Sequence, residues 1–377
     1  MQDLHTMRAL PQPPRRSATE PQRGHTRWGC SRSVSVTFVM TVMISDDARR
    51  GHYNDEVTRS HHDGLGVAVY RGDELARYGF ADDHPFGADR HAIFWQGMEA
   101  RGLADRVLVV PPAAASRDEI ESFHTSAYAD RVVELSRRGV GYLDYGDTPA
   151  FPGADEAAGW VVGSTLNAVG RLMEGACRRA FVPIAGLHHA RRSTAGGFCV
   201  YNDCAIAIEI LRSRWGVRRI AYVDIDAHHG DGVFYAFEED PDVVIGDIHQ
   251  DGRTLYPGTG AAHETGLGSA EGSKLNIPLL PGADDTTFLH EWNRIEHHID
   301  SAAPEFVILQ CGADGLAGDP LAHLEYSATA HRRATADLCR IADRHCGGKL
   351  LALGGGGYDP AGIADAWCAV VAAMLCS

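Results

Sequence analysis

Carboxylates and imidazoles follow several short apolar runs in this sequence, and the densest group is the segment 224–231, Asp-Ile-Asp-Ala-His-His-Gly-Asp. Asp226 and His228 are two residues apart, so in an extended segment both side chains lie on one side and can bind one metal ion. Asp314, after the run 306–310, is the best candidate for a third ligand. Two carboxylates and one imidazole, with a position open for water, suit catalytic zinc. The alternative, that Asp226 and His228 only cap the next helix, is disfavoured by Asp314 and by the nearby histidine pairs.

The pair His188-His189 follows another apolar run, 181–185. A histidine pair alone is more often a structural hydrogen-bonding feature than a catalytic one. Here, however, Asp224 and Asp231 are not needed as metal ligands, and each can bind the far nitrogen of one imidazole. Such a contact selects the tautomer of the ring and raises its basicity. The two histidines are therefore candidates for acid–base chemistry beside the metal.

A run of four glycines, Gly354–Gly357, precedes Tyr358. This run lacks the Lys-Ser/Thr pair of a phosphate-binding P-loop and the spacing of a dinucleotide-binding motif. A flexible loop that lets a tyrosine swing over a metal ion explains the pattern better. Tyr358 is therefore a further candidate for the same site.

The elements that must position these residues alternate in type. Short apolar runs predict strands, and longer segments with helical spacing predict helices between them. The expected strands are 67–70, 107–110, 181–185, 219–224, 243–248, 306–310 and 350–353. The expected helices are 90–101, one capped by Ser116 with Glu119, 156–179, 204–215, 232–238, 286–301, 331–345 and 361–375. This alternation predicts an α/β fold, a single domain with a mostly parallel central sheet flanked by helices. Its active site is expected at the carboxyl ends of the strands, where the candidate residues lie.

The composition excludes several classes of protein. The 377 residues carry a net charge of −15, which argues against binding to nucleic-acid phosphates. There is no run of about 18 apolar residues that could span a membrane. Nine irregularly spaced cysteines favour buried thiols in a reducing compartment, so we expect a cytoplasmic protein. Residues 1–45 are rich in Arg, Ser and Pro; we expect a disordered leader, the alternative being a targeting or nucleic-acid-binding tail. Residues 46–377 are expected to form the catalytic domain.

Together the motifs resemble those of the histone deacetylase superfamily, whose members have the arginase–deacetylase fold. They occur in the family's order across the region 66–377, and the set is very specific. The motifs are Gly186–Ala190, Gly196–Asp203, Tyr222–Gly232, Tyr256–Gly260, Gln310–Asp314, Ala317–Pro320 and Gly354–Tyr358. Two further segments, Asp82–Phe86 and Gly146–Pro149, are similar to the bacterial acetoin-utilisation branch of that family.

The resemblance implies a role for each candidate residue at the reacting centre. The implied zinc ligands are Asp226, His228 and Asp314. His189 resembles the general base and later acid, supported by Asp231. His188 resembles its electrostatic partner, supported by Asp224. Tyr358 would hydrogen-bond the carbonyl oxygen of the substrate.

The resemblance also implies residues that surround this centre. The walls of a narrow acyl-lysine tunnel would be Gly197, Phe198 and Tyr256. Asp147 resembles a carboxylate at the rim that holds the substrate backbone, and Arg90 an arginine of the internal acetate-exit channel. A structural potassium ion would be held near Asp224, Asp226 and His228. Asp247 replaces the serine that is usual at that site.

The expected reaction is hydrolysis of an amide: removal of an acetyl group from the side-chain amine of lysine in proteins or peptides, with release of acetate. The alternative substrates are acetylpolyamines or other small N-acyl amides. Leu321 stands where polyamine-selective relatives can place a glutamate, which favours a peptide. Two rival functions are weaker. A two-manganese ureohydrolase would need more aspartate ligands where this chain has His188, His189 and Tyr358, and a non-catalytic acyl-lysine reader would not need the complete set. No nucleic-acid or membrane partner is expected.

Overall fold

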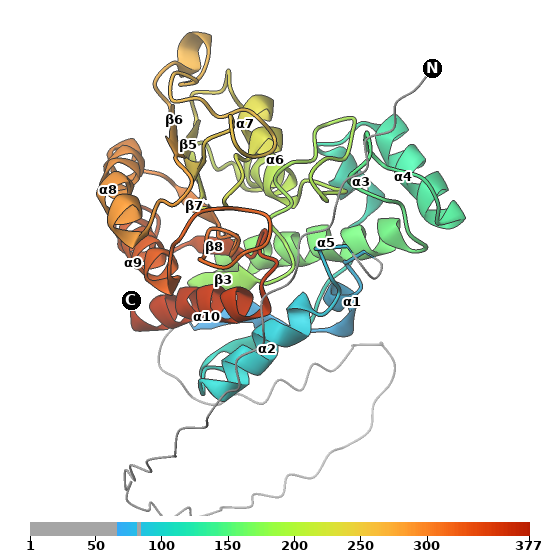
Figure 1. Cartoon of the computed structure of the whole chain (residues 1–377), viewed down its shortest axis with the longest axis horizontal. Helices are drawn as coiled ribbons and strands as arrows, with labels where there is room; N and C mark the ends of the chain where they lie inside the picture. The colour runs from blue at the N-terminus through green and yellow to red at the C-terminus, as the bar shows by residue number, and fades with distance from the viewer. Residues whose placement is uncertain (1–65, 81–83) are drawn as a thin grey trace, which may run out of the picture. The chain divides into compact units, whose positions relative to one another are not determined.

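The computed structural model describes residues 66–80 and 84–377, so the expected leader at residues 1–45 lies outside the described residues. One eight-stranded sheet runs through this part of the chain in the order β2-β1-β3-β8-β7-β4-β5-β6, and all neighbouring strands are parallel. Figure 1 labels five of these strands, β3, β8, β7, β5 and β6. The strands are β1 (Val67–Tyr70), β2 (Leu108–Val110), β3 (Arg179–Val182), β4 (Ile220–Asp224), β5 (Val243–Gln250), β6 (Lys274–Leu279), β7 (Phe306–Gln310) and β8 (Leu350–Leu353). The predicted parallel sheet is confirmed.

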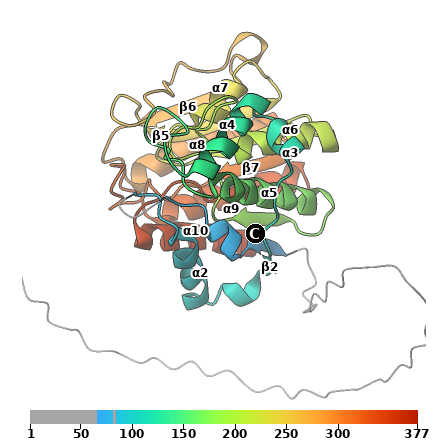
Figure 2. The same cartoon turned by 90° about the vertical axis from the view of Figure 1, so that its right-hand side faces the viewer.

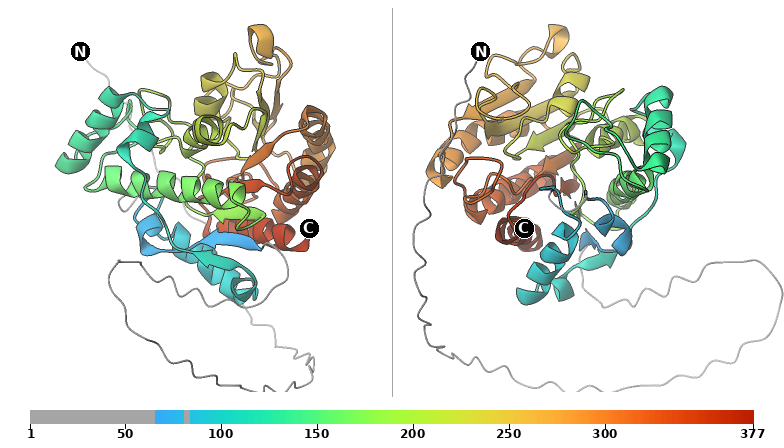
Figure 3. Two further views of the ribbon diagram at one scale, coloured as in Figure 1. Left: turned by 180° about the vertical axis from the view of Figure 1, so that it is seen from behind. Right: turned by 45° about the vertical axis from the view of Figure 1, so that its right-hand side comes forward.

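Helices cover both faces of the sheet, as a parallel sheet of apolar strands requires. They are α1 (Asp73–Ala76), α2 (Arg90–Ala100), α3 (Arg117–Glu121), α4 (Ser126–Arg138), α5 (Ala154–Met173), α6 (Asp203–Trp215), α7 (Asp231–Ala236), α8 (Asp285–Ala302), α9 (Ala328–His345) and α10 (Pro360–Cys376), with short 3-10 turns η1 (Ala104–Arg106) and η2 (Gly268–Ala270). Helices α2, α10, α9 and α8 contact one another in that order, and α5 contacts α6; Figures 2 and 3 show these groups from other sides. Within the described residues, no helix combines the length and the apolar character needed to cross a membrane.

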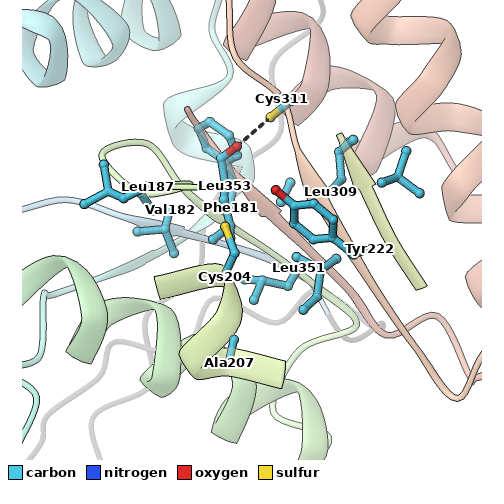
Figure 4. Close-up of a cluster of buried hydrophobic side chains, with 14 of the residues drawn as sticks. Phe181, Val182, Leu187, Cys204, Ala207, Tyr222, Leu309, Cys311, Leu351 and Leu353 are labelled. Atoms are coloured by element: carbon cyan, nitrogen blue, oxygen red, sulfur yellow. Dashed lines mark hydrogen bonds between the residues drawn. The ribbon is translucent and has the colours of Figure 1, made fainter. Parts of the chain in front are cut away.

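The core lies between the central strands and these helices. Figure 4 shows part of it, where Phe181, Tyr222, Leu309 and Leu351 from four different strands pack with Cys204 of α6. Each of these side chains is fully buried. Of the described cysteines, all are unpaired and only Cys376 is exposed, which agrees with the expectation of buried thiols. This rigid core fixes the strand ends that carry the candidate residues.

One predicted helix ran too far along the chain, and one strand was missed. The helix expected at 156–179 ends at Met173, because Gly175 takes a left-handed conformation (φ 73°) and Arg179 already belongs to β3. Arg179 is buried there, with its guanidinium bonded to Asp343 and to the carbonyl of Met374. Strand β6 was not expected at all: it begins with a lysine and contains a proline, both rare in strands. In both cases a charged first residue, Arg179 in β3 and Lys274 in β6, made a buried strand hard to recognise from the sequence.

The capping box at Ser116 is confirmed, since its side chain accepts from the backbone N–H of Glu119 and its backbone N–H donates to that glutamate. The helix that it starts, α3, ends after only five residues. A second helix, α4, begins after Thr125 and was not expected. The segment between α4 and α5 then leads to the mouth of the site.

Candidate active site

The three predicted metal ligands converge at the carboxyl ends of β4 and β7. His228 Nδ1 lies 3.1 Å from Asp226 Oδ1 and 3.0 Å from Asp314 Oδ2, and all three residues are buried. The other carboxylate oxygens are already used: Asp226 Oδ2 accepts from Gln310 and from the N–H of Gly356, and Asp314 Oδ1 accepts from the N–H of residue 227. The atoms left to face one another are one nitrogen and two oxygens, within 4.8 Å.

The chemistry of these three atoms fits a divalent cation. Burial alone would lower the pKa of His228, but its contacts with Asp226 and Asp314 raise it to about 10. Burial and the charge of Asp226 raise the pKa of Asp314 to about 7. A positive charge between these three side chains would therefore be stabilised. A zinc ion would provide that charge, and two carboxylates with one imidazole are ligands that zinc accepts.

Beside this cluster, each of the two predicted catalytic histidines is bonded to its predicted aspartate. The distances are 2.7 Å from His189 Nδ1 to Asp231 Oδ1 and 2.7 Å from His188 Nδ1 to Asp224 Oδ2. The Nε2 atoms of the two rings are 3.0 Å apart. One ring must donate in that contact and the other must accept, so the two histidines differ in protonation.

The surroundings decide which histidine carries the extra proton. Burial and the charge of His188 lower the pKa of His189 to about 4. Burial opposes protonation of His188 as well, but Asp224 and Asp226 outweigh it and raise its pKa to about 9. The directions of these shifts favour a protonated His188 that donates to a neutral His189.

A cavity of about 250 Å³ leads to these groups. Its lining includes all the predicted tunnel and rim residues: Asp147, Gly197, Phe198, Tyr256 and Leu321, together with Asp226, His188, His189, His228 and Tyr358. Asp224, Asp231 and Asp314 lie behind these groups and do not line it. Gly197 has a left-handed conformation (φ 52°), and a Cβ there would lie 2.3 Å from the His189 ring. Apolar walls with a few polar groups are typical of a ligand-binding site.

Tyr358 lies beside the same cavity, and a neighbouring loop holds it. Its backbone N–H donates to Asp319 Oδ2 at 2.8 Å, while Asp319 Oδ1 accepts from the N–H of Leu321 at 2.9 Å. The Asp319 carboxylate thus holds the backbone of both Tyr358 and Leu321 in place. Burial raises the pKa of Tyr358 well above its usual value, so its hydroxyl keeps its proton and can donate.

The sequence matches the family model described as the histone deacetylase domain over residues 84–374. The chain belongs to the histone deacetylase family. It is 38% identical over 293 residues to acetoin utilization protein AcuC of Bacillus subtilis, covering 75% of each chain. It is 31% identical over 324 residues to histone deacetylase RPD3 of Saccharomyces cerevisiae, covering 83% of this chain and 73% of that protein. The crystal structure of the HDA15 HD domain superposes with a TM-score of 0.77 at 28% identity, covering 83% of this chain and 88% of that one. These findings confirm the resemblance and the arginase–deacetylase fold.

In this member of the histone deacetylase family, Arg90 does not line the tunnel. It begins α2, is buried, and donates to the carbonyls of Gly355 (2.6 Å) and Gly357 (2.9 Å). Its guanidinium stacks 4.0 Å from the Phe86 ring, and its Nη1 has no hydrogen-bond partner. Arg90 borders a separate cavity of about 520 Å³ that also reaches Tyr358. The arginine therefore stands between the tyrosine loop and this second space.

Several functional contacts were not predicted. Gln310 binds Asp226, Tyr222 donates to Asp224 Oδ2 at 2.6 Å, and Phe86 and Leu255 line the tunnel. Gln310 could have been found, because it is a polar residue at the end of an apolar strand and pairs in register with Asp224. Tyr222 carries no such signal, since a tyrosine inside an apolar strand is ordinary core.

Proposed function

We propose that this protein is a zinc-dependent deacetylase that removes acetyl groups from lysine side chains in proteins or peptides and releases acetate. The observation that carries the proposal is the meeting, at one cavity, of a buried Asp-His-Asp cluster with two histidines that are each bonded to a buried aspartate. A zinc ion held by Asp226, His228 and Asp314 supplies a Lewis acid and lowers the pKa of water. One catalytic ion is proposed.

The residues of the chain supply proton transfer and charge stabilisation. His189, with Asp231 fixing its Nδ1–H, would exchange the contact of its Nε2 with His188 for the attacking water, take a proton there and return it to the leaving amine. His188 would lie beside it as an electrostatic partner. The Tyr358 hydroxyl donates to the oxygen that becomes negative in the transition state; removing one such donor typically costs about 3–4 kcal/mol.

The cavity favours a peptide substrate. Phe198, Tyr256 and Leu321 form apolar walls for the lysine stem, and Asp147 lies at the rim, where it can accept from a backbone amide. Leu321 offers no partner to a distant ammonium group. A second candidate, an acetylpolyamine, is favoured by one observation: Asp144 and Asp147 together line the outer space beside the tunnel and could hold a cation.

The two rival functions find less support. The described residues hold a single cluster of three metal-ligating side chains, whereas a two-manganese ureohydrolase needs a second set of ligands. A non-catalytic reader would not require a neutral base bonded to a buried aspartate. The buried thiols of the described region suit the reducing cytoplasm, which we propose as the location.

Two further features are proposed from the family. Arg90, with its free Nη1 beside a cavity, would guide acetate away from the site. A structural potassium ion would bind near Asp224, Asp226 and His228. Its neighbour Asp247 already pairs with His249 at 2.6 Å, and His249 Nε2 faces the carbonyl of residue 260, so a cationic imidazole lies next to that site. Activity measured with and without potassium tests this feature.

The experiment that tests the main proposal measures zinc content and turnover of an acetyl-lysine peptide by the wild type and Asp314→Ala. We expect one zinc ion per wild-type chain, with turnover, and neither property in the variant. Circular dichroism should show that the variant is folded, because the ligand lies at a strand end outside the core. Full zinc occupancy in Asp314→Ala, or a zinc-loaded wild type without hydrolysis, would contradict the proposal.

A further inference from the structure

Asp231, the partner of His189, is bonded at both of its carboxylate oxygens. Oδ1 accepts from His189, and Oδ2 accepts from two nitrogens of Arg191, Nη2 at 2.8 Å and Nε at 3.3 Å. The Asp231 side chain is 3% exposed, whereas that of Arg191 is 53% exposed. A guanidinium that binds one carboxylate oxygen through two nitrogens restricts rotation of the carboxylate. Arg191 therefore helps to keep Oδ1 of Asp231 directed toward the imidazole of His189.

The chain builds this contact locally. Arg191 follows His189 by two residues, and its own N–H donates to the carbonyl of Thr194 at 2.9 Å in a tight turn. Its guanidinium also lies 5.5 Å from the centre of the Tyr235 ring on α7, the helix that Asp231 begins. One short segment therefore carries both the base and the cation that holds the aspartate of that base.

The other histidine has a different support. Asp224, the partner of His188, accepts from the neutral hydroxyl of Tyr222 and from the N–H of residue 226. No guanidinium contacts it among the hydrogen bonds of the described residues. Asp224 therefore has no guanidinium partner in the described part of the chain, whereas the second oxygen of Asp231 is held by Arg191.

We infer that Arg191 is a positioning residue for the reaction: it holds the Asp231 carboxylate in the orientation that fixes the His189 ring. This inference rests on the proposed function, because it assigns Arg191 an effect on the step that His189 performs. Arg191 does not line the tunnel itself, but it borders the outer space that Asp144 and Asp147 also line. An effect of Arg191 through Asp231 should therefore appear in kcat, whereas a contact with substrate in the outer space should appear in KM.

The position of Arg191 allows a chemical test. Arg191 lines the outer space beside the tunnel, a cavity of about 580 Å³, together with Asp231, His189 and Thr194. Because the guanidinium is half exposed in this space, a small guanidinium ion from solution could take its place after truncation. Urea, which has a similar shape and no charge, could not supply the ionic contact.

The experiment compares full-length, zinc-loaded wild type with Arg191→Ala and Arg191→Lys on an acetyl-lysine peptide. We expect kcat of Arg191→Ala to fall about tenfold, in the range typical for a partner that supports a catalytic or ligating histidine, while KM changes less than twofold. Arg191→Lys should recover part of kcat. Low millimolar guanidinium, below denaturing concentration, should raise kcat of Arg191→Ala, and urea should not.

Arg192→Ala is the matched control. Arg192 is the next residue in the same turn, and its side chain binds Glu209 and the carbonyl of Phe123, away from the catalytic histidines. Its loss removes the same charge and should leave kcat near the wild-type value, with no response to guanidinium. Unchanged kcat in Arg191→Ala, or an equal fall in both variants without rescue, would overturn the inference.

A second readout separates this inference from the proposed function. The Nδ1–H proton shared by His189 and Asp231 should give a downfield proton NMR signal, assigned by its loss in Asp231→Asn. We expect this signal to shift or broaden in Arg191→Ala and to persist in Arg192→Ala, whether or not the peptide is hydrolysed. A signal unaffected by Arg191→Ala would contradict the positioning role even in an active enzyme. An inactive wild type would contradict the proposed function alone.

Discussion

At the scale of single residues, two neighbouring imidazoles of the same type have opposite properties. His188 and His189 are both buried and both bonded to an aspartate at 2.7 Å. They differ in the charges around them, since His188 also lies near Asp226, while His189 lies next to the positive His188. This difference supports the proposal that His189 performs the acid–base chemistry.

The protonation states predict how activity depends on pH. His189 must be neutral to accept a proton, so kcat/KM should rise as pH increases through its lowered pKa. His188 must be protonated, so kcat/KM should fall as pH increases toward its raised pKa, about 9. The pH–rate profile of the wild type should therefore be bell-shaped. His188→Ala should lose the alkaline fall, and His189→Ala should lose about 10²–10⁴-fold in rate, the larger defect of the two. The reverse order of severity would show that the base is assigned to the wrong histidine.

At the scale of elements, loops at the strand ends hold the ligands in place. Gly356, after β8, approaches the metal cluster so closely that a Cβ would lie 2.2 Å from Asp314 Oδ2. At the rim, Asp144 Oδ1 accepts from three backbone N–H groups, of residues 146, 147 and 148. Thr148 then links Asp147 to the N–H of Phe198 in the tunnel wall. Backbone contacts thus position both the floor and the mouth of the cavity.

Gly356→Ala should displace the Asp314 carboxylate and weaken zinc binding by at least about tenfold, as loss of an ordered metal-site contact does. Zinc affinity measured by competition with a chelator tests this. The matched control is Gly170→Ala in α5, where an added Cβ meets nothing within 4 Å. That substitution should leave zinc affinity unchanged and stabilise the fold by about 0.5–1 kcal/mol. Equal zinc affinity in the two variants would show that the site tolerates the methyl group.

The rim loop should make substrate binding depend on pH. Burial and the neighbouring Asp144 raise the pKa of Asp147 to about 6, so its carboxylate is ionised only above that pH. KM for a peptide should therefore decrease as pH rises through about 6. Asp144→Asn removes the neighbouring charge but keeps an oxygen for the loop N–H groups, and should move this change to lower pH. Asp144→Ala should raise KM at all pH values with little change in kcat. A KM that is constant between pH 5 and 8 would mean that Asp147 does not bind substrate.

At the scale of the whole molecule, the acidic chain attracts cations in general, so the shape and charge of the tunnel must provide selectivity. Leu321 lies in the tunnel lining, and an apolar side chain offers no charge partner to a cationic substrate. The acidic rim residues lie farther out and can serve a peptide or an ammonium group.

We expect kcat/KM to be higher for acetyl-lysine in a peptide than for N-acetylputrescine or N8-acetylspermidine. Leu321→Glu should narrow or reverse this ratio, because it adds a negative charge beside the tunnel. Leu321→Gln, similar in size and uncharged, is the control and should change the ratio much less. The measurement is a panel of kcat/KM values for the three substrates and three proteins. A wild type that prefers the acetylpolyamines by tenfold or more would favour the second candidate function.

The sequence by itself determined the central strands of the sheet and the groups at their ends. Parallel strands must be apolar along their length because both faces are covered, so β4, β7 and β8 stand out in the sequence, and the polar residues after them must meet at one edge. This pattern alone predicts that Asp226, His228 and Asp314 lie together.

Only the tertiary structure decided the features that depend on what a side chain meets across the fold. Arg179 can be buried in β3 because its guanidinium binds Asp343 and a carbonyl at the end of α10. The sequence around Arg179 does not indicate either partner. The unequal protonation of His188 and His189 depends on charges from separate strands. The contact of Arg191 with Asp231 joins two segments 40 residues apart. Spacing along a chain determines which face a residue occupies, but hydrogen bonding and electrostatic energy depend on distances that exist only after the elements have packed.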